Sequence, residues 1–524
     1  MAALRTFVFP CRYRDSAFLM KLSVQAGAQT NVEVSAMMGT ARNKELLKSS
    51  GMSGEGFDMA GPEDLLVALR GQASRLDRAE AVLRRLLSQD SSPAAPPGEA
   101  DGDAPLTIMQ AERDTRGDAP RVAFLSMAGE YARYEAAQAL AAGLDVVLYS
   151  DNISLQDERA LKELALRRGR LLAGPGCGAA IIDGVPLAFA NRVRKGSVGI
   201  AATSGTGLQE ASCLLDRMGL GVSQAYGTGG RDMQDEIGGI STLTAFSRLA
   251  RDSATHLIAI IAKNPGEATR RRLLDAVRRQ QKPVVLLYLG ASDTNMEKAA
   301  GIPIARSLTE LALLAARTLA PLLDVSCVGQ PDLPLPAARL PGFLRGVFSG
   351  STLCIEAAET ASRLLASPVR CNIPLPCCQL LPDGAESAGH AFLDMSAAAF
   401  TVGRAHPLMA PEHKFDRVTQ ELVAQNVAAV MTDIVLGCGT APNQAALLVR
   451  SMDQAAALSH GRSRGVEVVA SVCGTENDSP SRSSQLAILR QAGVRVLGSN
   501  AQAAVWAASR IARAEKRPRQ GHDR

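Results

Sequence analysis

Ser204-Gly205-Thr206-Gly207 is the stretch whose residue types are best suited to chemistry. An apolar segment typical of a buried strand precedes it, and Leu208, Leu214 and Leu215 follow with helical spacing. A strand that enters a helix through such a turn leaves backbone N–H groups free at the positive end of the helix dipole. Glycines let an anion approach the backbone closely, and the hydroxyls add donors. The stretch predicts a phosphate or carboxylate site, with an ordinary hydroxyl-capped turn as the equal alternative.

Gly229, Gly230 and Arg231 form a second candidate group, within the run YGTGGRD. Arg404 occupies the corresponding place in the later run FTVGRAHP. A guanidinium group can fork onto two oxygens of a phosphate or carboxylate, so both arginines are predicted catalytic residues that hold substrate. The alternative is that each arginine forms an ion pair with a neighbouring acid.

His406 follows in the same run, and Pro407 stiffens the turn that carries it. The imidazole predicts a substrate donor or a general acid or base, and a loop histidine that caps a turn is the alternative. Asp232 and Asp433 come at the ends of predicted strands. Each of these aspartates either holds substrate or caps a turn.

An internal repeat is the strongest evidence for the fold. Residues 345–356 echo 199–210, and each copy has a strand, a Ser-Gly-Thr-like turn and a helix. The remaining strands recur in the same order, with 427–437, 466–474 and 493–500 matching 255–262, 283–290 and 301–307. Strands that alternate with helices favour parallel sheets covered on both faces. The repeat predicts two doubly wound α/β domains with ligands at the carboxyl ends of their strands.

The composition excludes several classes of function. A net charge of +5 over 524 residues, with scattered arginines, does not predict a nucleic-acid surface. No apolar run approaches the ~20 residues of a membrane span. The ten cysteines have no metal-like spacing. With no signal peptide at the start of the sequence, reduced thiols and a cytoplasmic location are expected.

Several motifs carry a family resemblance. The runs AGPGCGAAIIDG, KGSVGIAATSGTGLQE and GTGGRD resemble the α subunit of succinyl-CoA synthetase, and the segment from Phe343 onward resembles the carboxyl-terminal domain of its β subunit. The runs MMGTARNKELL, SDNISLQDE, PLAFAN and TVGRAHPLM resemble the FdrA proteins. The resemblance covers nearly the full length, apart from linkers and tail.

The resemblance implies a division of the chain into a CoA-binding Rossmann-like domain and two flavodoxin-type domains, preceded by a small α+β domain. The predicted units are an N-terminal α+β domain at 1–90, a disordered linker at 91–119, a CoA-binding-like domain at 120–195, a flavodoxin-type domain at 196–325, a linker at 326–342, a second flavodoxin-type domain at 343–514 and a basic tail at 515–524. CoA is the cofactor that this resemblance implies.

The same resemblance implies an active centre where two helix N-termini face each other across a phosphorylated histidine. One helix start matches the turn at Ser204, and the other matches the run that contains Gly437, Gly439 and Thr440. The family places its histidine after the strand PVVLLYLG, where this sequence has residues 290–294, GASDT, and no histidine. There is also no ATP-grasp segment. Nucleotide-driven thioester synthesis by the usual route is therefore not expected from this chain alone.

A phosphate pocket without a phosphate carrier suits direct transfer from or to an acyl phosphate. The FdrA resemblance implies a subunit of a hetero-oligomeric oxamate carbamoyltransferase, which converts oxalurate and phosphate to oxamate and carbamoyl phosphate in purine and allantoin breakdown. Two alternatives stay open. One is an acid–CoA ligase that works with an ATP-grasp partner, and the other is a non-catalytic subunit that binds CoA or a phosphometabolite.

Overall fold

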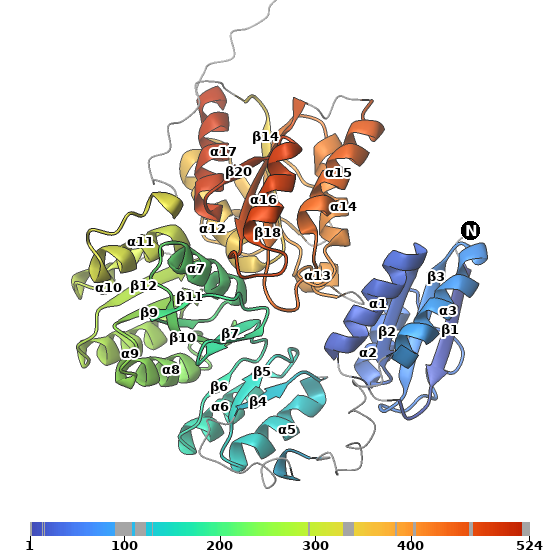
Figure 1. The fold of residues 1–524 in the computed structure, drawn as a ribbon, viewed down its shortest axis with the longest axis horizontal. Helices are drawn as coiled ribbons and strands as arrows, with labels where there is room; N and C mark the ends of the chain where they lie inside the picture. The colour runs from blue at the N-terminus through green and yellow to red at the C-terminus, as the bar shows by residue number, and fades with distance from the viewer. Residues whose placement is uncertain are drawn as a thin grey trace, which may run out of the picture.

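The computed structural model describes residues 3–12, 14, 16–89, 107–110, 122–127, 129–291, 294–328, 340–382, 385–401, 405–460 and 465–515. Most of both predicted linkers and of the basic tail lies outside these residues. The described residues form four sheets with their helices (Figure 1). Among them, no helix is both long and apolar enough to cross a bilayer.

The N-terminal unit is a three-stranded antiparallel sheet in the order β1-β3-β2. Its elements are β1 (Ala3–Phe9), α1 (Ser16–Thr30), β2 (Glu33–Met38), α2 (Ala41–Ser49), β3 (Leu65–Gly71) and α3 (Ala73–Gln89). Residues of α1 and α3 share one apolar core with the sheet. This confirms a small α+β unit. The sequence pattern predicts one helix over 62–88, which is wrong, because the apolar run at 65–69 is the buried central strand.

A three-stranded parallel sheet follows, in the order β4-β5-β6. Its elements are β4 (Val122–Leu125), α5 (Gly129–Ala141), β5 (Asp145–Leu148), α6 (Leu155–Arg167) and β6 (Leu172–Ala173). The alternation of strands and helices is the Rossmann-like pattern that the sequence predicts. The hairpin of β7 (Ala179–Ile182) and β8 (Val185–Ala188), which lies within the predicted 120–195 unit, instead joins the next sheet through Ile181 and Ala225.

Two seven-stranded sheets make up the rest of the molecule. The first has β9 (Lys195–Ala202), β10 (Val222–Gly227), β11 (Leu257–Lys263), β12 (Val284–Leu289) and β13 (Ile304–Ala305) beside the hairpin. The second has β14 (Phe343–Phe348), β15 (Val369–Cys371), β16 (Gln379–Leu380), β17 (His390–Asp394), β18 (Val427–Val435), β19 (Glu467–Cys473) and β20 (Arg495–Leu497).

Both large sheets contain the same run of parallel strands. The orders are β10-β9-β11-β12-β13 and β17-β14-β18-β19-β20. The helices of the first unit are α7 (Gly205–Arg217), α8 (Ile240–Arg251), α9 (Glu267–Arg278), α10 (Asn295–Ala299) and α11 (Leu308–Leu319). Those of the second are α12 (Ser351–Leu364), α13 (Ala398–Thr401), α14 (Glu412–Val423), α15 (Gln444–Leu458), α16 (Arg482–Gln491) and α17 (Asn500–Glu515). The shared order confirms the predicted repeat of doubly wound units.

The two large units pack against each other with reciprocal contacts. Glu356 on α12 accepts a hydrogen bond from the backbone N–H of Leu308, at the start of α11, at 2.7 Å. Glu210, at the equivalent position on α7, accepts from the N–H of Asn500, at the start of α17, at 3.4 Å. Each unit thus caps a helix of the other, which fixes the two sheets relative to each other.

Candidate active site between the two seven-stranded sheets

The N-termini of α7 and α12 meet at the border between the two large units. Ser204 caps α7, because its Oγ accepts a hydrogen bond from the N–H of Gly207 at 2.9 Å. The same Oγ contacts Oγ1 of Thr352 in the first turn of α12. A Cβ added at Gly350 would lie 3.3 Å from Oγ1 of Thr206. The predicted turn is therefore a buried helix start, and it faces its own repeat copy.

Lys263, at the carboxyl end of β11, lies beside these helix starts. Its Nζ donates to Oγ of Ser351, the first residue of α12, at 2.8 Å. Gly230 is on the other side, since a Cβ added there would be 3.9 Å from the same Nζ. Burial lowers the pKa of Lys263, and the charge of Asp394 works against that shift. Lys263 is half-buried, and the neighbouring Gly230 is exposed.

Three further charged side chains lie at the strand ends of the second unit. Nζ of Lys414, on α14, is 3.1 Å from Oδ1 of Asp433 near the end of β18. Asp433 in turn accepts from the N–H of Ser349, just before α12, at 2.9 Å. Asp394 ends β17, and burial raises its pKa, while hydrogen bonds from the N–H and hydroxyl of Ser396 and the charge of Lys263 lower it. We call Lys263, Asp394, Lys414 and Asp433 the inter-sheet charge cluster.

The cluster combines the groups that anion chemistry needs. Two helix N-termini bring positive dipole ends to one place, and Lys263 adds a charge that hydrogen-bonds oxyanions. Asp394 adds a buried carboxyl group, a side-chain type that can act as a general acid or base. Parallel α/β sheets bind ligands at the carboxyl ends of their strands, where Lys263, Asp394 and Asp433 lie, and Lys414 of α14 joins them through Asp433.

The run that contains Gly437, Gly439 and Thr440 does not form the second helix start that the resemblance implies. The helix α15 begins four residues after Thr440, at Gln444. The turn packs instead on the segment after β8, where the N–H of Cys438 donates to the carbonyl of Ala190 at 3.0 Å. The helix whose N-terminus faces that of α7 is α12, which is the counterpart of α7 in the repeat.

His406 lies beside this turn. Its ring centroid is 5.8 Å from that of Phe189, and its Nδ1 accepts from the N–H of Leu408 at 3.1 Å. Burial lowers the pKa of His406 to about 4, and the charge of Asp433 opposes that shift. The ring is therefore neutral at pH 7 and carries its proton on Nε2. It remains a candidate donor at the edge of the cluster.

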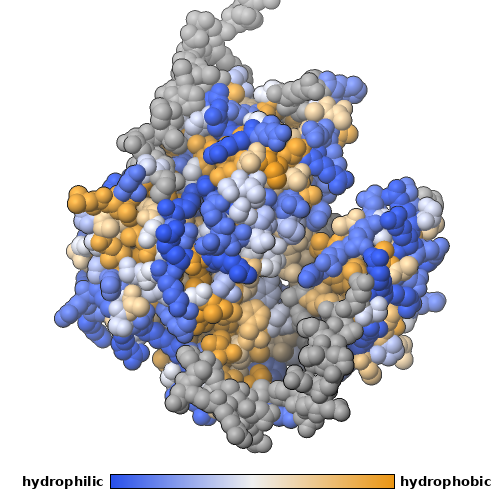
Figure 2. Space-filling view, in the orientation of Figure 1, coloured by the Kyte–Doolittle hydropathy of each residue, from blue (hydrophilic) through white to orange (hydrophobic). Residues whose placement is uncertain are grey.

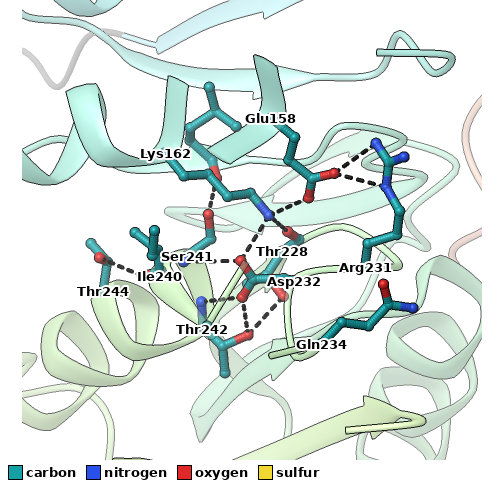
Figure 3. Close-up of polar contacts among 12 residues, drawn as sticks. Glu158, Lys162, Thr228, Arg231, Asp232, Gln234, Ile240, Ser241, Thr242 and Thr244 are labelled. Atoms are coloured by element: carbon teal, nitrogen blue, oxygen red, sulfur yellow. Dashed lines mark hydrogen bonds and ion pairs between the residues drawn. The ribbon is translucent and has the colours of Figure 1, made fainter. Parts of the chain in front are cut away.

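Arg231 is held in a different network (Figure 3). Its guanidinium pairs with Glu158 of α6 at 2.7 Å and donates to the carbonyl of Ile153 at 2.8 Å. Lys162 Nζ joins Glu158 to Asp232, at 2.8 Å and 2.7 Å respectively. Arg231 thus forms an ion pair with a buried acid, as in the alternative that the sequence leaves open, and phosphate binding by Arg231 stays a prediction. Its repeat counterpart Arg404 lies outside the described residues.

Asp232, Gly229 and Gly205 each have a close structural contact. Asp232 accepts from the N–H groups of Ser241 and Thr242, at 3.1 Å and 2.8 Å, and so caps α8. Gly229 has a φ of +95°, and a Cβ there would lie 2.9 Å from the carbonyl oxygen of Gly174. Gly205 likewise packs on Gly178, with 3.2 Å between an added Cβ and the Gly178 Cα.

The comparisons with known proteins match this architecture. A family model described as CoA-ligase matches residues 347–510, and one described as "AllF, heavy metal-associated domain" matches residues 1–104. The protein YahF of Escherichia coli (strain K12) is 34% identical over 521 residues, which covers 98% of this chain and 100% of YahF. The chain belongs to the YahF family. This family is FdrA-like and related to succinyl-CoA synthetase.

More distant relatives match in part. The succinate–CoA ligase α subunit of Methanothermobacter thermautotrophicus is 27% identical over 150 residues, 28% of this chain and 50% of that protein. The one of Aquifex aeolicus is 26% identical over 190 residues, 35% of this chain and 60% of that protein. The acetyl-coenzyme A synthetase 1 of Ca. Korarchaeum cryptofilum, solved with phosphate and ADP, is 15% identical with a TM-score of 0.34, over 78% of this chain and 85% of that chain.

The first 104 residues of this YahF-family chain do not fit a soft metal ion. They contain a single cysteine, Cys11, and no histidine. Soft ions need several thiolate or imidazole ligands. Within the described ranges, no group of three or more candidate ligand side chains comes together. The phrase "heavy metal-associated", which describes the matching family, therefore does not carry over to the donors of this chain.

The Rossmann-like unit does fit an anionic group such as a phosphate of CoA. Ser126 follows β4, and its Oγ is buried with no partner among the described residues. The neighbouring N–H of Met127 is held by Oγ of Ser150 at 2.9 Å, and α5 starts just beyond. A hydroxyl group without a partner at a first βα turn is a suitable phosphate donor.

Sequence reasoning missed three members of the inter-sheet charge cluster, Lys263, Asp394 and Lys414. The first two share a signal, because each directly follows a run of buried strand residues, LIAIIA and HAFL. Charged residues at the carboxyl end of a parallel strand are candidates for a site in this fold class. Lys414 lies inside a helix and shows no such signal.

Proposed function

We propose that this chain is a subunit of an oxamate carbamoyltransferase that binds phosphate at the inter-sheet charge cluster. The resemblance to FdrA proteins suggests the reaction. The observation that carries the proposal is the pair of facing helix starts, with Lys263 beside them and no histidine in the loop after β12. Such a site can hold an oxyanion, but it lacks the residue on which the related ligases would carry phosphate.

The proposed chemistry is a direct transfer. A phosphate oxygen attacks the carbamoyl carbon of oxalurate, the bond from that carbon to the amide nitrogen breaks, and the nitrogen takes up a proton as oxamate leaves. Lys263 and the first turn of α12 hold the phosphate. Asp394, at the carboxyl end of β17, is the proton donor in this proposal. Other subunits complete the enzyme in this proposal.

The test uses the full chain together with its candidate partner subunits. The complex is mixed with oxalurate and phosphate, and carbamoyl phosphate and oxamate are measured. The proposal expects both products in equal amounts without added nucleotide. It is contradicted if the active complex forms no carbamoyl phosphate, or forms it only when ATP and CoA are present.

An acid–CoA ligase is the second candidate, favoured by the CoA-ligase match and by the hydroxyl of Ser126. In that case CoA lies on the Rossmann-like unit, and an ATP-grasp partner supplies the phosphate. The ligase predicts nucleotide hydrolysis that requires both CoA and an acid. A chain that only binds CoA or a phosphometabolite would show binding in calorimetry, and variants of the cluster would leave the turnover of the full complex unchanged.

A further inference from the structure

Cys377 and Cys378 form a pair of neighbouring thiols outside the site described above. They lie between β15 and β16, and their Sγ atoms are 3.7 Å apart. Cys377 is exposed and Cys378 is half-buried. Oγ of Ser362, on α12, donates to the carbonyl of Cys377 at 2.7 Å, so the pair is anchored to a long helix.

Cys377 opens onto a cavity of about 220 Å³ that Ala291, Glu359 and Pro376 also line. Ala291 belongs to the loop after β12, so the cavity lies on the border between the two large units. Glu359 also contacts this loop, because its Oε1 accepts from the N–H of Gly290 at 2.9 Å. Cys377 itself is exposed. A small reagent can therefore reach the Cys377 sulfur from solvent.

The two thiols differ in their chemistry. A hydrogen bond from the Cys378 thiol lowers the pKa of Cys377 to about 7, against the opposing effects of burial and of Glu359. The same contact raises the pKa of Cys378. Because its pKa is about 7, Cys377 holds a large thiolate fraction at neutral pH. The thiolate is the reactive form of cysteine. An accessible thiolate with a second thiol beside it has the features of an oxidation site.

We propose that Cys377 is a peroxide-reactive modification site and that Cys378 is its resolving thiol. The Cys377 thiolate attacks one oxygen of a hydroperoxide, the O–O bond breaks, and the other oxygen leaves and takes up a proton. Sulfur is oxidised by two electrons to sulfenic acid, and the peroxide is reduced. The Cys378 sulfur then displaces the hydroxyl as water, which forms an S–S bond between the two residues.

The test treats the full chain with hydrogen peroxide at neutral pH and analyses its peptides by mass spectrometry, with dimedone as a trap for sulfenic acid. The native chain is expected to lose two hydrogens from the peptide that holds both cysteines. C378S is expected to accumulate the dimedone adduct on Cys377, and C377S to give neither product. The exposed Cys11, with no cysteine beside it in the sequence, is the internal control.

Three results would overturn the proposal. The first is that Cys377 reacts no faster than Cys11 in the same sample. The second is that C378S traps no sulfenic acid although Cys377 is consumed. The third is that the disulfide in the native chain links two molecules, which a non-reducing gel detects.

Discussion

Lys263 is the single side chain on which the account of the site depends. Its amine is 2.8 Å from the hydroxyl of Ser351, beside the two facing helix starts. In related settings, the loss of one donor to a developing oxyanion costs about 10²–10³ in kcat. In the proposed function, this lysine marks the place where phosphate binds.

We expect K263M to lower kcat of the reconstituted complex by about 100-fold, because the phosphate loses its cationic donor. The measurement is the steady-state rate of carbamoyl phosphate formation. K298M, on the exposed surface of α10, is the matched control and keeps the native rate. A native rate in K263M, with the same melting temperature as the control, would place the site elsewhere.

His406 predicts a pH dependence of stability. Its pKa is about 4 in the native chain, against 6.5 in the unfolded chain. Between these values the unfolded chain binds a proton that the native chain does not, so the free energy of unfolding falls as the pH drops from 6.5 to 4. H406Q should reduce this fall by about 1–3 kcal/mol in denaturant titrations across that range. Identical pH profiles for both chains would show that the ring is not buried as described.

Some residue roles could be predicted from the sequence and others could not. Ser204 caps a buried helix, which is one of the two roles that the sequence predicts equally for it. Arg231 could not be assigned, since the buried acid that binds it, Glu158, lies 73 residues away. Periodicity gives no information on such distant partners.

The helices and strands could be predicted from the sequence better than the side-chain contacts could. The repeat predicts that both large units are built alike, and the structure confirms it, because the two sheets share one order of parallel strands. Errors arise where local pattern is ambiguous. The run at 65–69 is apolar at every position, which suits a helix or a buried strand equally. The turn at Gly437 resembles a helix start, yet Asn443, in the left-handed conformation, comes directly before α15.

The reciprocal helix caps make a prediction at the scale of elements. Burial raises the pKa of Glu356 to about 7, while Asn500 and Leu308 lower it by hydrogen bonding. The unfolded carboxyl group loses its proton near pH 4.5, so native stability falls as the pH rises from about 4.5 to 7.

E356Q removes this ionisation. The fall in stability that Glu356 causes between about pH 4.5 and 7 should therefore be absent from the variant. The measurement is the melting temperature of the variant and the native chain at several pH values. E267Q, which changes an exposed carboxylate on α9, is the control and keeps the native profile. An unchanged slope in E356Q would contradict the raised pKa.

At the scale of the molecule, the Rossmann-like unit is fixed to the first large unit by buried charges. Lys162 is fully buried between Glu158 and Asp232 (Figure 3). A second contact, between Arg248 of α8 and Asp145 at the start of β5, lies at 2.8 Å. Figure 2 shows blue, hydrophilic residues and orange, hydrophobic residues side by side on the visible face.

We expect K162M to weaken the packing between the Rossmann-like unit and the first large unit. Without Lys162 the buried carboxylate of Asp232 loses its cationic partner, which costs about 3–5 kcal/mol of stability. The measurement is the rate of limited proteolysis near residues 174–178, together with the first melting transition. R271M, which breaks an exposed ion pair on α9, should change either quantity little. Equal proteolysis of both variants would show that the charges do not hold the border.

Phosphate location tests the central claim most directly. A crystal of the chain soaked with carbamoyl phosphate should show anion density within hydrogen-bond distance of Lys263 Nζ, at the first turn of α12. Density at the Gly437 turn alone, or no density at Lys263 in a chain whose complex forms carbamoyl phosphate, would contradict the account.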